Sequence, residues 1–238
     1  MEKTVSEAIN YRRSVRKFDP NKEIDVNIVK KCIKNGVLAP TSSNLQLWEF
    51  YHIINKDLLK KISKICFNQP AASTAKQIVI TVVRKDLWKL RSNQNIEFFN
   101  LKKKELSKKQ YDSTQKYYKI AIPFVYRDFL GILSIFKYII TNILGYFRVM
   151  YRQVKASDTR IVAHKSAALA SQNFMISMAG FGYDTCPMEG FDSLKIKNLL
   201  KLNKNSEINM IIGCGIRLEE GVYGERFRIP FEEVYFEK

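Results

Sequence analysis

Apolar positions follow two different periods along the chain. Four segments carry apolar side chains every three or four residues, which predicts amphipathic helices: 5–11, 25–36, 57–66 and 158–179. Three further segments are near-continuous runs of β-branched and aromatic residues, which predicts strands: 48–54, 77–83 and 208–215. A short extended segment and a turn are expected over 183–190. Strands that alternate with helices indicate an α/β or α+β layer fold.

The middle of the chain, between about residues 93 and 155, has a different pattern. Runs of lysine are followed by a long apolar stretch over 120–151. On a helix, the small and polar residues of this stretch form one narrow stripe: Gly131, Ser134, Lys137, Thr141, Gly145, Arg148 and Arg152. Such a helix is buried against a partner or lies in a membrane interface. We expect burial, as a cover over an active site or as a dimer contact, with weak membrane contact through 120–151 and a transmembrane span as alternatives.

The composition is that of a folded, globular protein. Of the 238 residues, 46% are hydrophobic and 26% charged, and the low Gly and Pro content excludes collagenous and low-complexity chains. The four cysteines form no CxxC pair, so we expect four reduced thiols rather than a zinc knuckle or a redox motif. The N-terminal residues contain no apolar core of signal-peptide length, so we expect a cytoplasmic protein.

The charge balance points to a phosphate-bearing ligand without identifying it. Lys and Arg outnumber Asp and Glu by 40 to 23, and the net charge of +17 attracts nucleic acid, anionic lipid and nucleotide cofactors alike. Arginines gather near both ends of the chain: Arg12, Arg13 and Arg16, and Arg226 and Arg228. Guanidinium groups bind phosphate oxygens bidentately, so the two clusters together could hold one phosphate monoester. An ordinary solvated charge run is the alternative.

Common catalytic signatures are missing from the sequence. It contains no GxGxxG, GxxxxGK[ST], HExxH or GxSxG motif, and we expect no metal site. Only two histidines are present, His52 in a predicted strand and His164 in an Ala-rich predicted helix, and we expect structural roles for both. The chemistry must therefore come from a bound cofactor or from carboxylates.

Four short segments together resemble the FMN-dependent nitroreductase family, in order and at the right separations. They are Arg-Arg-Ser-Val-Arg-Lys-Phe at 12–18, Ala-Pro-Thr-Ser-Ser-Asn-Leu-Gln-Leu-Trp at 39–48, Pro-Met-Glu-Gly-Phe-Asp at 187–192 and Arg-Phe-Arg-Ile-Pro at 226–230. The resemblance covers roughly residues 5–92 and 157–236. It implies an α+β fold with a central, mainly antiparallel sheet flanked by helices, in an intertwined homodimer with one FMN at each of two interface sites. The chain would be a single domain over 1–238, with a basic and apolar helical insertion at about 93–155.

The resemblance also implies cofactor contacts, residue by residue. Four residues would hold the FMN phosphate, ribityl chain and pyrimidine edge, and two would complete the phosphate site: Arg12, Arg13, Ser14 and Arg16, then Arg226 and Arg228. Three would reach the FMN of the other subunit: Thr41, Ser42 and Asn44. Asn68 would hydrogen-bond the flavin ring, although Gln69 beside it could do the same. A last group would lie along the flavin edge, where a backbone N–H stabilises developing charge: Pro187, Met188, Glu189 and Gly190.

The function implied is hydride transfer from NAD(P)H through FMN to an oxidised acceptor, with ping-pong kinetics. The acceptor would be a nitroaromatic, a quinone or an enone, and no catalytic side chain beyond the flavin contacts is expected. Several aromatic residues of the middle segment could cover the flavin: Phe129, Phe136, Tyr138, Tyr146 and Phe147. Two alternatives remain open. One is the same fold with a different flavin chemistry, dehalogenation or flavin destruction, and the other is a basic nucleic-acid-binding module. We expect no nucleic-acid partner.

Overall fold

The computed structural model describes residues 2–128 and 132–238, so Phe129 and Gly131 lie outside the described residues. Four strands form one sheet: β1 (Trp48–Ile53), β2 (Gln77–Val83), β3 (Asp184–Met188) and β4 (Glu207–Gly215). Their order is β1-β2-β4-β3, and every neighbouring pair is antiparallel. The antiparallel sheet and the α+β class are thus as predicted, and β3 is left as an edge strand.

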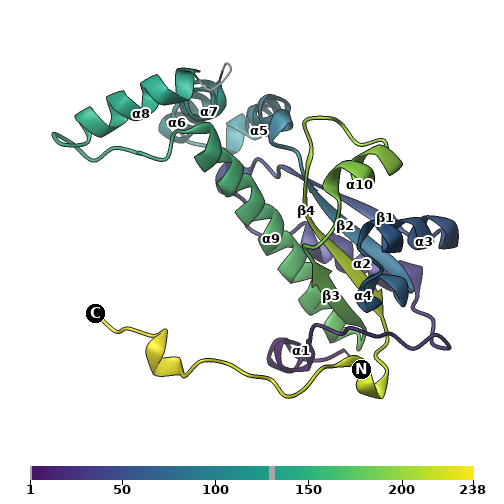
Figure 1. Ribbon diagram of the computed structural model, residues 1–238. Coiled ribbons are helices and arrows are strands. Elements are labelled where there is room, and N and C mark those ends of the chain that lie inside the picture. The colour runs from purple at the N-terminus through teal and green to yellow at the C-terminus, as the bar shows by residue number, and fades with distance from the viewer. Residues whose placement is uncertain (1, 129–131) are drawn as a thin grey trace.

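Helices cover both faces of the sheet (Figure 1). One layer contains α2 (Val26–Gly36) and the long α9 (Ala156–Gly180), and the other contains α3 (Lys56–Ile65), α4 (Pro70–Ser73) and α10 (Ser193–Leu199). Alternate residues of β2 face these two layers, as the pleat of a strand requires. Ile78 and Ile80 pack in the core beside α3, α4 and α10, whereas Val79 packs beside α2 and α9.

Small residues let α9 lie close to its neighbours. Ala167 and Ala170 are fully buried, and a side chain at Gly36 of α2 would stand 3.0 Å from the carbonyl oxygen of Ala170. The short α1 (Val5–Tyr11) crosses the end of α9, where the N–H of Lys3 donates to the carbonyl oxygen of Gly180 at 2.9 Å. The N-terminal segment that follows α1 is therefore fixed at the C-terminal end of α9.

The middle segment is helical and lies at the other end of α9. It contains α5 (Trp88–Leu101), α6 (Lys108–Lys116), a π-helical turn (Tyr117–Ala121), α7 (Ile122–Tyr126) and α8 (Ile132–Leu144). Tyr118 and Ile122 share a core cluster with Leu45, Trp48 and Ala167. This cluster joins the middle segment to the sheet and to α9, while α8 projects beyond it (Figure 1).

In the single chain the apolar side of the middle helix is exposed, and its burial as a dimer contact stays a prediction. Ser134 and Thr141 of the polar stripe are buried, whereas Ile135, Phe136, Ile139 and further apolar residues of α8 are exposed. Of the predicted stripe, Ser134, Lys137 and Thr141 lie on α8 and face the protein, whereas Gly145, Arg148 and Arg152 follow the end of this helix at Leu144. Within the described ranges, no helix is long and apolar enough to cross a membrane.

Two further features bear on the site. All four cysteines are buried and unpaired, and burial raises the pKa of each thiol, that of Cys66 to about 11.

Residues 222–238, here called the C-terminal arm, run away from the body of the molecule (Figure 1). Apolar residues of the arm are exposed, among them Phe227, Phe231 and Phe236. Within the arm, the rings of Phe231 and Tyr235 stack with their centroids 4.8 Å apart, and Val222 packs against a core cluster.

Candidate functional site

The two arginine clusters of the sequence meet in one pocket. A cavity of about 250 Å³ lies between the segment that follows α1 and the start of the C-terminal arm. All six residues predicted for the phosphate site line it: Arg12, Arg13, Ser14, Arg16, Arg226 and Arg228. The remaining lining comes from the arm: Val222, Tyr223, Glu225 and Phe227. We call this cavity the basic pocket.

Backbone contacts and two buried apolar side chains fix the N-terminal wall of the basic pocket. Val15 and Phe18 are buried, so the residues between and before them are held at the surface. The N–H of Val15 donates to the carbonyl oxygen of Thr185 at 3.1 Å, which places this wall along the free edge of β3. The N–H of Arg16 donates to the carbonyl oxygen of Gly221 at 2.6 Å.

A buried ion pair lies behind that wall. Asp184, at the start of β3, is 2% exposed and accepts hydrogen bonds from the Arg217 backbone N–H at 2.8 Å and from its Nε at 2.9 Å. The Arg217 Nη2 atom contacts the same carboxylate and donates to the carbonyl oxygen of Tyr11 at 3.1 Å. The Arg217 guanidinium also lies over the Tyr11 ring, 4.3 Å from its centroid. This network joins α1, β3 and the end of β4.

Arginine side chains close the pocket from the other side. Arg226 Nη2 donates to the carbonyl oxygens of Asn10 at 2.7 Å and Arg12 at 2.9 Å, and Arg13 Nη2 donates to that of Gly224 at 3.0 Å. These bonds attach the arm to the last turn of α1 and to the segment after it. Arg226 and Arg13 each use a single guanidinium nitrogen, Nη2, for these bonds. A guanidinium carries five N–H groups on three nitrogens, so donors remain for a ligand.

The electrostatics of the basic pocket favour an anion. Burial lowers the pKa of Arg12, and the neighbouring charges of Arg226, Arg228 and Arg13 lower it further. Across residues 2–128 and 132–238, no carboxylate forms a salt bridge with any arginine of this pocket. Mutually repelling guanidinium groups without a carboxylate partner are stabilised when a phosphate binds between them.

The predicted flavin-edge residues lie at the far end of β3 from the basic pocket. Gln69 Nε2 donates to the carbonyl oxygen of Gly190 at 2.6 Å and to that of Cys66 at 3.1 Å. Gln69 is thus committed to joining the 66–69 turn to the 187–190 segment, and Asn68 beside it is exposed. Asn68 and its neighbour Phe67 have positive φ angles of 50° and 57°, a backbone region that non-glycine residues seldom adopt.

The four residues of the 187–190 segment differ in what they present. Met188 is buried in the core at 2% exposure, so only its backbone is available to a ligand. Pro187 is half-buried, and Glu189 and Gly190 are exposed. Cys186 and Met188 are two residues apart on β3, so their side chains point to the same face of the sheet, and both belong to one core cluster.

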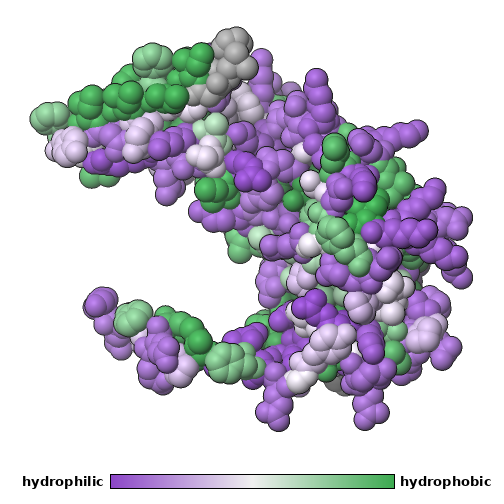
Figure 2. Space-filling model, in the orientation of Figure 1, coloured by the Kyte–Doolittle hydropathy of each residue, from purple (hydrophilic) through white to green (hydrophobic). Residues whose placement is uncertain are grey.

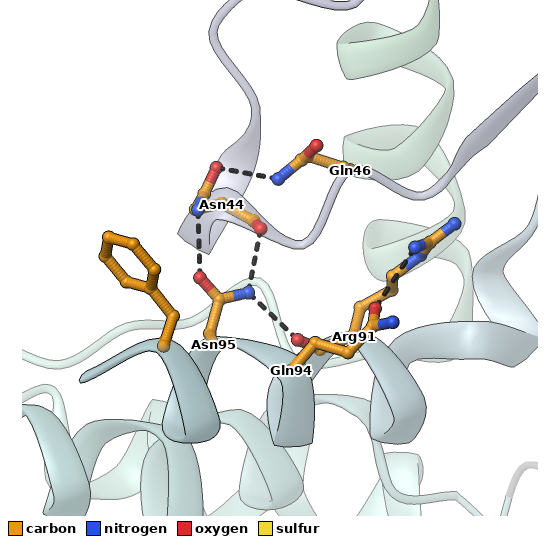
Figure 3. A pocket seen from close by; sticks show the side chains of 6 residues that line it. Asn44, Gln46, Arg91, Gln94 and Asn95 are labelled. Atoms are coloured by element: carbon orange, nitrogen blue, oxygen red, sulfur yellow. Dashed lines mark hydrogen bonds between the residues drawn. The ribbon is translucent and has the colours of Figure 1, made fainter. Parts of the chain in front are cut away.

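The loop over 41–46 forms a second pocket, about 320 Å³ in volume (Figure 3). Three of its residues have positive φ angles: Ser43, Asn44 and Gln46. Asn95, on α5, holds this strained backbone. It accepts from Asn44 Nδ2 at 2.9 Å and donates to the carbonyl oxygens of Asn44 at 3.0 Å and Arg91 at 2.9 Å (Figure 3).

Tyr118 adds to the support of the same loop. Its hydroxyl donates to the carbonyl oxygen of Ser43 at 3.0 Å and lies 3.3 Å from Asn95 Oδ1. Neither Asn95 nor Tyr118 was predicted from the sequence to be a site residue. Only the packing of the middle segment against the loop reveals them as positioning residues.

The loop and the basic pocket lie far apart within one chain. The N–H of Ser42 faces Ser166 Oγ at 3.4 Å, whereas α1 contacts α9 at Gly180. At 1.5 Å per residue these two points of α9 are about 21 Å apart along the helix. Thr41, Ser42 and Asn44 therefore do not join the other predicted site residues in the single chain.

Both histidines have structural surroundings. Gln77 donates to the carbonyl oxygen of Ile24 at 2.8 Å, so its Oε1, 2.7 Å from His52 Nε2, accepts a hydrogen bond from that ring. Burial lowers the pKa of His52. His164 lies on α9, and its Nε2 is 3.2 Å from a carboxylate oxygen of Glu207 on β4. In the described part of the chain, no group of three or more His, Cys, Asp or Glu residues is placed to hold a metal ion.

Comparison with known sequences identifies close similarity to one family. The model of the nitroreductase family matches residues 9–216. Protein DrgA of Synechocystis sp. is 26% identical over 224 residues, which cover 94% of this chain and 89% of DrgA. SH0546 of Staphylococcus haemolyticus, whose name specifies an NAD(P)H nitroreductase, is 27% identical over 240 residues, covering 98% of this chain and 97% of the relative.

Solved structures share the fold. SE1966 of Staphylococcus epidermidis, described as an NAD(P)H:FMN oxidoreductase, has a TM-score of 0.73 at 17% identity, with 100% of this chain and 98% of that chain covered. A nitroreductase structure from Exiguobacterium sibiricum, solved in complex with FMN, has a TM-score of 0.69 at 20% identity, with coverage of 99% and 98%. At these identities the likeness is one of fold.

Proposed function

Because this chain belongs to the nitroreductase family of oxidoreductases, we propose that it binds FMN and uses NAD(P)H to reduce an oxidised small molecule. The observation that carries the proposal is the basic pocket. It gathers five arginines from the two ends of the chain around one cavity, and none of them is paired with a carboxylate among the described residues. A dianionic phosphate monoester matches such a set of donors in charge and geometry.

The remaining cofactor contacts follow the free edge of β3. Arg12, Arg13, Ser14, Arg16, Arg226 and Arg228 would hold the phosphate and the adjoining ribityl chain. Ser14 pairs with Thr185 near the start of β3, and Gly190 follows its end, so one elongated ligand could extend along this edge. Asn68 would hydrogen-bond the ring, and the backbone N–H groups of Glu189 and Gly190 would stabilise charge that develops there. Pro187 and Met188 would contribute backbone only.

We propose that the site is completed by a second copy of the chain. Thr41, Ser42 and Asn44 lie too far from the basic pocket to serve it within one chain, and their strained loop is nevertheless held firmly by Asn95 and Tyr118. Strained backbone that the surrounding structure maintains is typical of functional segments. The exposed apolar residues of the C-terminal arm also call for a partner surface. A homodimer satisfies both features.

The reaction needs little from the side chains beyond binding and orientation. FMN, when bound, would supply the redox chemistry, in which a hydride from NAD(P)H is passed on to the acceptor as two electrons and a proton. The residues named above would hold the flavin, and the 41–46 loop of a second copy would line the space next to it. NAD(P)H and the acceptor would use that space in turn, which gives ping-pong kinetics. The acceptor we propose is a nitroaromatic, a quinone or an enone.

The experiment is a titration of the purified protein with FMN, followed by flavin fluorescence and by bleaching of the visible spectrum with NADH or NADPH. Arg226→Ala and Arg12→Gln should each raise the Kd for FMN by about 10- to 100-fold, the value of a hydrogen bond to a charged group. Arg148→Ala, which removes an exposed arginine outside the pocket, is the matched control and should leave the Kd unchanged. A well-folded protein that takes up no FMN would refute the proposal.

A further inference from the structure

The helix α8 is amphipathic in the reverse sense of an ordinary surface helix. Ser134 is 4% exposed and Thr141 1%, whereas Ile135 and Phe136 are about 60% exposed. Figure 2 shows hydrophobic side chains along the outer side of α8 and hydrophilic ones on the side toward the rest of the molecule. The loop after α8 continues the exposed apolar surface with Tyr146, Phe147 and Val149. We call the exposed apolar residues of 132–149 the α8 patch.

Polar contacts on the inner side hold α8 in this orientation. Lys137 Nζ donates to three carbonyl oxygens at the end of α7: Phe124 at 2.9 Å, Val125 at 3.2 Å and Arg127 at 2.7 Å. Asp128 accepts from the Ser134 backbone N–H at 3.1 Å and from its hydroxyl at 3.0 Å. Rotating α8 to bury its apolar side would break these bonds and expose the acceptors. The outward apolar face is therefore built into the fold.

The returning loop reinforces the arrangement. Arg152 donates to Asn142 Oδ1 at 3.1 Å and to the carbonyl oxygen of Gly145 at 2.7 Å, and Lys155 Nζ lies 3.7 Å from the centroid of the Tyr138 ring. Cations thus border the α8 patch along its inner edge. A large apolar surface bordered by cations is the pattern of a helix that lies in the interface of an anionic membrane.

The local charge argues for a lipid surface over a second copy of the chain as the occupant. Between residues 113 and 157 the sequence has seven Lys or Arg residues and a single acid, Asp128. Packing α8 against α8 of a second copy would bring two such positive segments together. An anionic lipid surface instead complements the charge and accepts the apolar side chains at the same time. The contact would be peripheral, because α8 has 13 residues and a helix needs about 20 to cross a bilayer.

From these contacts we propose that the α8 patch docks the enzyme onto anionic membranes, with the apolar side chains in the lipid interface and Arg148, Arg152 and Lys155 at the headgroups. Docking of this kind is independent of the basic pocket. It would bring the protein to a surface in which apolar acceptors are concentrated.

The test uses the full-length, FMN-supplemented protein and sedimentation with two kinds of vesicle, phosphatidylglycerol mixed with phosphatidylcholine, and phosphatidylcholine alone. We expect binding to the anionic vesicles that weakens as salt is raised. Ile135→Ser with Ile139→Ser should lower the partition coefficient about tenfold or more. The matched control replaces two exposed apolar residues elsewhere, Ile54→Ser with Leu194→Ser, and should bind as the unmodified protein does.

A charge reversal gives an independent measurement. Arg148→Glu should lower the partition coefficient about 25-fold, since each unit of charge near the surface contributes about a factor of five and the reversal changes the charge by two units. Lys204→Glu, an exposed residue in the loop before β4, makes the same change in net charge and should have little effect. The proposal is overturned if the protein does not bind anionic vesicles at low salt, or if the Ile135/Ile139 variant and the Ile54/Leu194 variant lower binding equally. It is also overturned if the α8 variant changes the oligomeric state, which would assign the patch to a second copy.

Discussion

Replacement of Asp184 by Asn tests whether the ion pair behind the basic pocket holds the fold together. The substitution keeps the shape of the side chain and removes its charge, so Arg217 loses its only carboxylate partner among the described residues. Breaking a buried ion pair costs about 3–5 kcal/mol. The Arg217 side chain is 28% exposed and is partly solvated, so we take the lower end, about 3 kcal/mol. That is a large part of the 5–15 kcal/mol by which domains are stable.

The assay is urea unfolding followed by circular dichroism at one fixed protein concentration, because dimerisation makes stability depend on concentration. Arg217→Met alone should also destabilise the protein, since it leaves Asp184 buried and unpaired. The double variant should cost at least 1 kcal/mol less than the sum of the single variants, because it leaves neither charge unpaired. Tyr11→Phe, which removes one hydroxyl at the border of the network, is the mild reference. A loss below 1 kcal/mol for Asp184→Asn, or strict additivity, would refute the reasoning.

Three further outcomes follow from the structure. Asn95→Ala removes the support of the strained 41–46 loop and should cost about 2 kcal/mol of unfolding free energy. Asn93 is exposed on the same helix, so Asn93→Ala should cost almost nothing. Equal effects of the two variants in urea unfolding would contradict the role of Asn95. Gly213→Ala would place a methyl group against the carbonyl oxygen of Ala71 and should lower the unfolding free energy by about 2 kcal/mol or more. The new methyl group of Gly180→Ala meets nothing closer than 3.8 Å, so the same measurement should find this variant neutral or stabilised. Burial lowers the pKa of His52 below its ordinary 6.5, so the unfolded chain binds the proton more readily than the folded chain does. The free energy of unfolding should therefore fall as the pH drops through and below 6.5. His52→Gln should flatten that part of the profile of unfolding free energy against pH.

Much of the fold could be predicted because its elements have simple periods. The β2 strand was predicted over its observed residues, 77–83, and the long helix 158–179 was correct to within two residues at each end. These elements are buried on one or more sides, so selection for packing leaves a clear apolar pattern. In the middle segment the same periodicity identified the polar stripe of α8 correctly. It could not tell which side of the helix faces the protein, because burial of a polar stripe depends on acceptors that other segments supply.

In the candidate site, too, features set by side-chain chemistry could be predicted from the sequence, whereas features set by tertiary contacts could not. The arginines of the basic pocket could be found from their side-chain chemistry, since bidentate donors at both ends of a chain suggest one anion. The roles of Asn95, Tyr118 and Gln69 could not, because a neutral side chain has no distinctive pattern until its partner is known. The choice between Asn68 and Gln69 is an example. The structure shows the Gln69 amide already donating to the carbonyl of Gly190.

Basic residues gather both in the basic pocket and around α8, and binding at these two sites should differ in its dependence on salt. In the basic pocket, the partly buried Arg12 would meet a phosphate at hydrogen-bond distance, where salt screens weakly. The cations around α8 would face lipid headgroups across solvent, and the Debye length of about 8 Å at physiological salt limits their attraction. Raising salt should therefore release the protein from anionic vesicles before it weakens FMN binding. One net charge of +17 would then serve two separable interactions, one set by directional donors and the other by surface potential.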